Sequence, residues 1–184
     1  MSFSIFAFVV IVVLVGITAV LYNKFVSKTQ MVKNGWADID VQLQRRGDLI
    51  PQIVATVKGY AAHEKNLFED VVAKRNEALS AGDDAIARGT AETALSAPMM
   101  KILALAEDYP DLKSNENFLD LQNELSDTEN KIEMARRFYN GAVRELNISV
   151  ESFPGNVLAG VFGFGPANFF EIDLADRSAP RVEL

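Results

Sequence analysis

The sequence predicts an all-α protein: an N-terminal transmembrane helix, then an antiparallel bundle of three to four long helices, and an irregular Gly/Phe-rich C-terminal tail. Three observations predict this class. The first 23 residues contain no charged side chain, the apolar residues from Trp36 onward step by three and four, and the bundle lacks the two-residue alternation of a half-buried strand. A chain of 184 residues is long enough for one such domain with its own core.

The N-terminal apolar segment runs from Phe3 to Tyr22. In a helix that rises about 1.5 Å per residue, this segment covers about 30 Å, the thickness of a bilayer's hydrocarbon core. A cleaved signal peptide is the alternative, but the segment has no basic start, is longer than the usual apolar region and precedes no small-residue cleavage site. We therefore expect one retained membrane crossing. The expected anchor residues include Phe3, Phe8, Leu14 and Tyr22.

Charge around this segment predicts its orientation. Lys24, Lys28 and Lys33 follow the span, whereas only the α-amino group precedes it. Basic residues near the end of a span stay on the cytoplasmic side. We expect a single-pass protein of the bacterial cytoplasmic (inner) membrane, with the bundle facing the cytoplasm.

An amphipathic helical pattern begins at Trp36 and continues to Leu79. Pro51 interrupts it, because proline removes a backbone donor and clashes with the preceding turn. We expect a kink or a helix restart near Leu49, with Asp48 capping the new turn.

The next stretch, residues 80–90, has two glycines and weak periodicity, which predicts a loop and a poor helix. Ser96 is then expected to cap a helix with Pro98 in its first turn. That helix should end at Tyr109-Pro110-Asp111, and Ser114 or Asn115 should cap the following one.

The last helix carries the most regular apolar spacing of the chain, in steps that alternate between three and four as in a coiled coil. Such a stripe needs a partner helix from this chain or another, and we favour an internal core over self-association. The stripe consists of Phe118, Leu121, Leu125, Thr128, Ile132, Ala135, Tyr139, Ala142, Leu146 and Phe153.

These patterns divide the chain into an anchor at 1–23, a helical bundle at 24–152 and a tail at 153–184. The tail is rich in glycine and phenylalanine. One interpretation is a segment folded back over the bundle surface, because exposed phenylalanines at this density would promote aggregation. The other is contact with the membrane interface or a partner.

The sequence contains no recognisable catalytic, metal-binding or cofactor-binding motif. Cysteine is absent, so disulfides and thiolate sites are excluded. His63 is the single histidine and reads better as a turn or cap residue than as a metal ligand. Serine-nucleophile and phosphate-loop motifs are absent. We expect no catalytic residue, cofactor or metal. From Glu64 onward the chain has 12 basic and 22 acidic residues, which argues against nucleic acid.

Two arginine pairs and the tail phenylalanines are the candidate interaction residues. Each arginine pair lies within a helical stripe, where it could form interhelical ion pairs or dock an acidic partner. The candidates are Arg45, Arg46, Arg136, Arg137, Phe162, Phe164, Phe169 and Phe170.

Several long motifs follow one another along the chain. They are YNKFV at 22–26, WADIDVQL at 36–43 followed by Arg45-Arg46 and Asp48-Leu49-Ile50-Pro51, TVKGYAAHE at 56–64, LALAEDYPDLKSNENFLDLQNEL at 103–125, TENKIEMARRFYNGAV at 128–143, and FPGNVLAGVFGF before Phe169-Phe170-Glu171. With these motifs the chain resembles the LemA family of bacterial membrane proteins, from the anchor to about residue 171. It departs from the family at Gly47, where a basic residue is common, and at Pro98, where a helix former is common.

The resemblance implies a single-pass helical-bundle protein of bacterial envelopes without an established enzymatic activity. Membrane organisation is the most concrete role it suggests, because a more distant relative of this type works in shaping magnetosome membranes. We expect a non-enzymatic, membrane-anchored scaffold that organises membrane or a protein assembly. Its partners would be membrane lipid and a protein, or a second copy of itself. The alternative is an enzyme or ligand-binding bundle with an unrecognised site.

Overall fold

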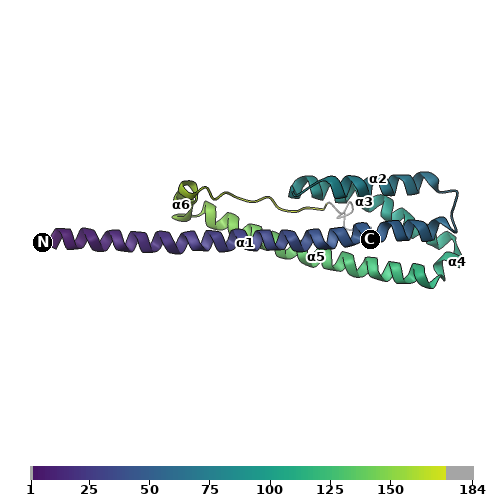
Figure 1. The fold of residues 1–184 in the computed structure, drawn as a ribbon, viewed down its shortest axis with the longest axis horizontal. Helices are drawn as coiled ribbons and strands as arrows, with labels where there is room; N and C mark the ends of the chain where they lie inside the picture. Colours follow the sequence, from purple (N-terminus) through teal and green to yellow (C-terminus); the bar gives the residue numbers. More distant parts are fainter. Residues whose placement is uncertain (1, 173–184) are drawn as a thin grey trace, which may run out of the picture. The chain divides into compact units, whose positions relative to one another are not determined.

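The computed structural model describes residues 2–172, and helices dominate this part of the chain, which contains no strand (Figure 1). The predicted all-α class is therefore confirmed. The tail beyond residue 172, which was predicted to cover the bundle or reach the membrane, lies outside the described residues. The elements in order are α1 (Ser2–Lys58), α2 (Lys65–Ser80), α3 (Ala85–Leu105), the short 3-10 helix η1 (Ala106–Asp108), α4 (Pro110–Lys113), α5 (Glu116–Glu151) and α6 (Gly155–Phe162).

The chain forms two compact units, and the two longest helices contribute to both. Unit 1 comprises Met1–Asp38 and Ala135–Asn168, and unit 2 comprises Ile39–Met134 and Phe169–Leu184. α1 continues without a break through residue 23, the expected end of the anchor. The division predicted from the sequence, at residues 23 and 152, differs from these unit boundaries and stays a prediction.

Unit 2 is a bundle of antiparallel helices. Arg46 of α1 pairs with Glu129 of α5, whereas Tyr60, just beyond the end of α1, contacts Asn115 at the start of α5. Residue numbers thus rise along one helix as they fall along the other. The core includes fully buried side chains from each long helix: Ile50, Ile53 and Val57 of α1, Val71 of α2, Ile102 of α3, and Phe118 of α5.

The apolar stripe of α5 is buried within the chain, as favoured from the sequence. Ile132, Tyr139 and Leu146 are each at most 5% exposed. The expected last member, Phe153, is instead 83% exposed, because α5 ends at Glu151. The stripe therefore serves an internal core over the length of the helix.

The helix restart predicted near Leu49 is wrong, because α1 passes through Pro51 as one helix. A proline cannot donate to the carbonyl four residues earlier, which here belongs to Gly47. The Arg75 guanidinium of α2 donates to that carbonyl oxygen in its place. Asp48, expected to cap a new helix, lies inside α1 and accepts a hydrogen bond from Gln44 at 3.2 Å. A side chain from the neighbouring helix thus compensates for the proline.

The loop predicted over residues 80–90 is also too long. α3 begins at Ala85, and the Asp84 carboxylate caps it by accepting a hydrogen bond from the Ala87 N–H at 3.0 Å. Pro98, expected in a first turn capped by Ser96, lies buried inside α3. The start of α3 was missed because its buried face is not apolar.

Other local predictions are confirmed. Asn115 accepts a hydrogen bond from the Phe118 N–H at 3.0 Å and so caps α5. α3, the helix expected to end at Tyr109-Pro110-Asp111, ends at Leu105, and η1 continues to Asp108. His63 lies in the turn between α1 and α2.

Unit 1 packs α1 against the second half of α5 and against α6. Lys28 forms an ion pair with Glu145 at 3.0 Å, and the rings of Trp36 and Tyr139 are 5.5 Å apart. The order of these contacts makes the two helices antiparallel. Hydrogen bonding to Lys28, and then its positive charge, lower the pKa of the exposed Glu145 carboxyl.

Candidate functional site

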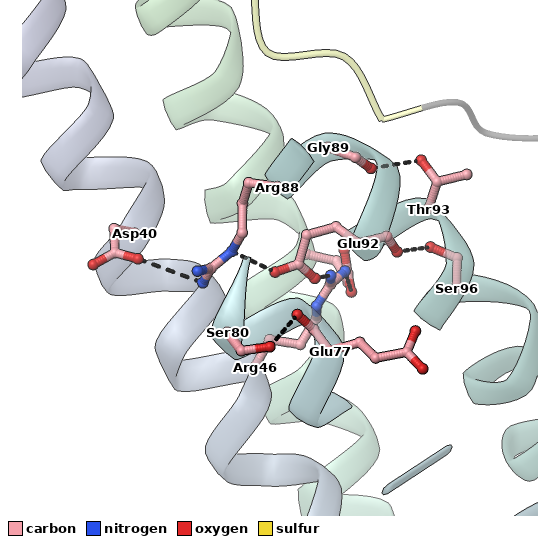
Figure 2. Close-up of polar contacts among 10 residues, drawn as sticks. Asp40, Arg46, Glu77, Ser80, Arg88, Gly89, Glu92, Thr93 and Ser96 are labelled. Carbon is pink, nitrogen blue, oxygen red and sulfur yellow. Dashed lines mark hydrogen bonds and ion pairs between the residues drawn. The ribbon is translucent and has the colours of Figure 1, made fainter. Parts of the chain in front are cut away.

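A cluster of buried charges lies inside unit 2 (Figure 2). Arg46 of α1 and Arg88 of α3 are each 4% exposed, and Glu92, one turn after Arg88, is 2% exposed. Buried arginine and glutamate are rare in proteins unless they are paired. The cluster therefore has to satisfy its own charges.

The Glu92 carboxylate stands between the two guanidinium groups. Arg46 donates to one of its oxygens, and the Arg88 Nε donates to the other at 3.0 Å. Each arginine also reaches a more exposed carboxylate: Arg46 contacts Glu129 at 2.9 Å, and Arg88 contacts Asp40 at 3.4 Å. The cluster thus connects α1, α3 and α5 through charge-assisted contacts.

The balance of burial and charge keeps Arg46 protonated. Burial by itself would lower its pKa, but the negative charges of Glu92 and Glu129 and their hydrogen bonds outweigh that effect and raise the pKa above its ordinary value. Arg46 therefore stays cationic at neutral pH.

This arrangement directs the charges at one another. Arg46 was a candidate for docking an acidic partner, but burial and its two carboxylate contacts place it in the interior, which corrects that assignment. Residues 2–172 also contain no group of three or more histidine, cysteine, aspartate or glutamate side chains arranged to hold a metal. The cluster fixes helices relative to one another.

The second candidate site is the apolar surface of α1 in unit 1. Every large apolar side chain from Phe3 to Val20 is exposed, among them the predicted anchor residues Phe8 and Leu14. The helix is long and apolar enough to cross a membrane, and none of its most apolar window is buried in the protein. No other described element covers this surface.

An aromatic cluster marks the end of that surface. The Tyr22 ring contacts Phe162 and Phe164 edge-on, with ring centroids 5.1 and 5.5 Å away. Phe25, which is 1% exposed, lies 5.2 Å from Phe164. Gly163 separates the two tail phenylalanines, and its positive φ of 73° ends α6 and turns the chain. The cluster holds α6 beside the end of the apolar stretch.

Side-chain hydrogen bonds to the backbone connect the segment after α6 to α5. The Asn147 amide donates to the Ala167 carbonyl at 3.0 Å and accepts from the Ala167 N–H at 2.8 Å. The Tyr139 hydroxyl donates to the Asn168 carbonyl at 2.9 Å. Sequence reasoning missed Asn147, since a polar residue on a helix gives no signal of a distant backbone partner.

The tail then runs against α3 in unit 2. A Cβ atom at Gly89 would overlap the Glu171 carbonyl oxygen, so glycine is required for this close approach. Phe170 beside it is fully buried. Up to residue 172, the tail is therefore folded onto helices, and Phe170 belongs to the interior, not to the predicted interaction surface.

The remaining candidates lie nearer the surface. Arg45 forms an ion pair with Glu124 at 2.8 Å, with the side chains 46% and 43% exposed. Arg136 is half-buried and Arg137 exposed, and both have interaction partners. Phe169 is 42% exposed.

Comparison with known proteins decides the family. The sequence model of the LemA family matches residues 35–184. The chain belongs to the LemA family. The match begins after the YNKFV motif and covers the motifs from WADIDVQL onward, so the predicted family is confirmed.

Two curated relatives are the magnetosome proteins MamQ 2 and MamQ 1 of Paramagnetospirillum magneticum. Each is 25% identical over 175 residues, which cover 82% of this chain and 64% of the relative. Magnetosome protein MamQ of Magnetospirillum gryphiswaldense is 24% identical over 174 residues, with 81% and 64% covered. This LemA-family chain thus spans less than two thirds of the relatives' length. Together with the apolar helix, they indicate a membrane-associated helical protein.

Proposed function

We propose that the protein is a single-pass anchor of the bacterial cytoplasmic membrane whose helical bundle faces the cytoplasm and works as a non-enzymatic scaffold. The observation that carries the proposal is the uncovered apolar surface of α1 from Phe3 to Val20. A surface of that size exposed to water would drive aggregation, whereas lipid hydrocarbon accommodates it without cost.

Helical geometry supports the crossing. Beyond the first turn of α1, the backbone N–H and C=O groups of the stretch bond within the helix, which a bilayer requires of any spanning segment. Thr18, the polar side chain near its end, donates to the Leu14 carbonyl at 2.9 Å. The stretch therefore presents almost no unsatisfied polar group to lipid.

Orientation in the proposal rests on basic residues after the span. Lys24 and Lys33 are exposed, and Lys28 is partly covered by its pairing with Glu145. Basic side chains close to a span favour the cytoplasmic side, whatever more distant acidic residues contribute.

A scaffold role is supported by how the bundle uses its polar groups. The buried charges of Arg46, Arg88 and Glu92 are directed at each other, which fixes helix register. Organisation of membrane or of a protein assembly is in keeping with the magnetosome proteins among the relatives. The bundle would act through its long exposed faces, with lipid, a protein or a second copy as partner.

Carbonate extraction of membranes tests the anchor. The native chain should remain in the pellet. Val12→Arg combined with Val13→Arg places two charges at the centre of the span, at a cost of about 2.5–3.5 kcal/mol each, and should release the chain. Val41→Arg is the matched control, because Val41 is an exposed valine further along the same helix; it should not change the distribution. A native chain found in the soluble fraction would refute the proposal.

A further inference from the structure

The segment around α6 is uncharged over an unusual length for a surface. No charged side chain occurs between Glu151 and Glu171. Within α6, Val157 and Val161 are 58% and 72% exposed, and Phe162 is 44% exposed. This outer face is apolar although no described element packs on it.

Contacts with α1 fix the level of α6 along the span. Gly155, the first residue of α6, packs beside the Phe25 ring, and Phe162, its last residue, contacts Tyr22. Phe162 also borders a shallow groove on α1 that extends back to Leu14. α6 therefore points from the residues after the span towards the span itself.

The chain after α6 returns in the opposite direction. Gly163 makes the turn, and Phe164 packs on Phe25, which lies beyond Tyr22. Asn147 then holds Ala167 further along α5. Residues 155–167 thus form a hairpin-like segment whose apolar tip contains Val161 and Phe162. Its base is tethered at Gly155 and at Ala167.

We propose that α6 and the turn after it insert into the lipid interface of the leaflet from which α1 emerges, as a second membrane contact. The inference rests on the proposed function, because α1 defines where the membrane is. If Tyr22 lies at headgroup level, Phe162 lies at the same level and Val161 faces the surrounding lipid.

Lipid fits this face better than a protein partner does. Phe162 of α6 borders the groove on α1 that reaches Leu14, so the same lipid can cover α6 and the apolar surface of α1. Apolar helices without charge at the headgroup boundary bind by burying area in lipid. Glycines at 160, 163 and 165 have open space around them and would let the tip settle among lipid chains.

The absence of cysteine allows a direct measurement of depth with the full chain. The full chain carrying Val161→Cys, labelled with an environment-sensitive fluorophore, is reconstituted into vesicles of phosphatidylethanolamine and phosphatidylglycerol. We expect emission at shorter wavelength and loss of most fluorescence when the lipids carry a quencher on the acyl chain. Val157→Cys is a second position, in case the first variant does not fold.

Two labelled positions on α1 serve as controls. Phe8→Cys lies within the span, and its label should be quenched by lipid. Val41→Cys is an exposed valine about 28 Å beyond Tyr22 along the helix, and its label should report water. A label at Val161 that behaves like the one at Val41 would overturn the inference.

Other outcomes separate the competing explanations. A Val161 label shielded from water-borne iodide, yet insensitive to the lipid quencher, would mean that protein covers α6 and would overturn the lipid contact. A Phe8 label insensitive to the lipid quencher would overturn the anchor itself and, with it, this inference. Quenching at Phe8 without quenching at Val161 or Val157 overturns only the second contact.

Discussion

Replacing Glu92 with glutamine should strongly destabilise unit 2. The amide keeps the size of the side chain but removes the one fully buried negative charge between Arg46 and Arg88. Two guanidinium groups would then face each other in the interior, each left with only a more exposed carboxylate. Breaking a buried ion pair on one side costs about 3–5 kcal/mol. That is a large share of the roughly 5–15 kcal/mol that stabilises a typical domain.

Thermal unfolding followed by circular dichroism of the full chain in detergent measures this loss. For a chain of this length, about 3–5 kcal/mol corresponds to a fall in melting temperature of about 6–20 °C. Glu124→Gln is the matched control, because it removes an acid that pairs with Arg45 at the surface, where such pairs contribute about 1 kcal/mol or less. Equal, small effects of the two substitutions would refute the role assigned to the buried cluster.

Two further predictions concern contacts that stabilise α1 and the tail. Arg75→Met should lower the free energy of unfolding by about 1–3 kcal/mol, because it leaves the Gly47 carbonyl unpaired. The loss should be clearly smaller in a chain that also carries Pro51→Ala, because alanine restores the helical N–H donor to that carbonyl. A double-mutant cycle that shows no coupling between the two substitutions would contradict this prediction. Asn147→Ala should speed hydrogen exchange at the Ala167 N–H, whereas Asn147→Asp, which still accepts that hydrogen bond, should protect it better; equal exchange in both variants would argue against the tether.

Apolar patterns predicted the parts of the fold that apolar contacts build. The stripe on α5 was recognised because Ile132, Leu146 and their neighbours are hydrophobic, and they are buried as expected. The uncharged N-terminal stretch likewise predicted a long apolar helix. In both cases the signal and the physical cause lie in the same residues.

The errors occur where residues distant in sequence provide the compensation. In the first half of α3 the charged residues Arg88 and Glu92 face inward, so the buried side of this helix shows no apolar periodicity in the sequence. These charges can be buried because Arg46 of α1 pairs with the Glu92 carboxylate. Pro51 interrupts no helix, since Arg75 replaces its missing donor. A single sequence shows neither pairing, so the buried cluster was not foreseen as a unit.

Labelling from one side of the membrane tests the single crossing of α1 most directly. Phe3→Cys and Val41→Cys introduce single exposed cysteines at the first residue of the apolar stretch and beyond its end on the same helix. In intact spheroplasts, a membrane-impermeant maleimide should label Phe3→Cys at once and Val41→Cys only after permeabilisation. Labelling of both variants in intact spheroplasts, or of neither until the membrane is opened, would contradict a helix that crosses the membrane once.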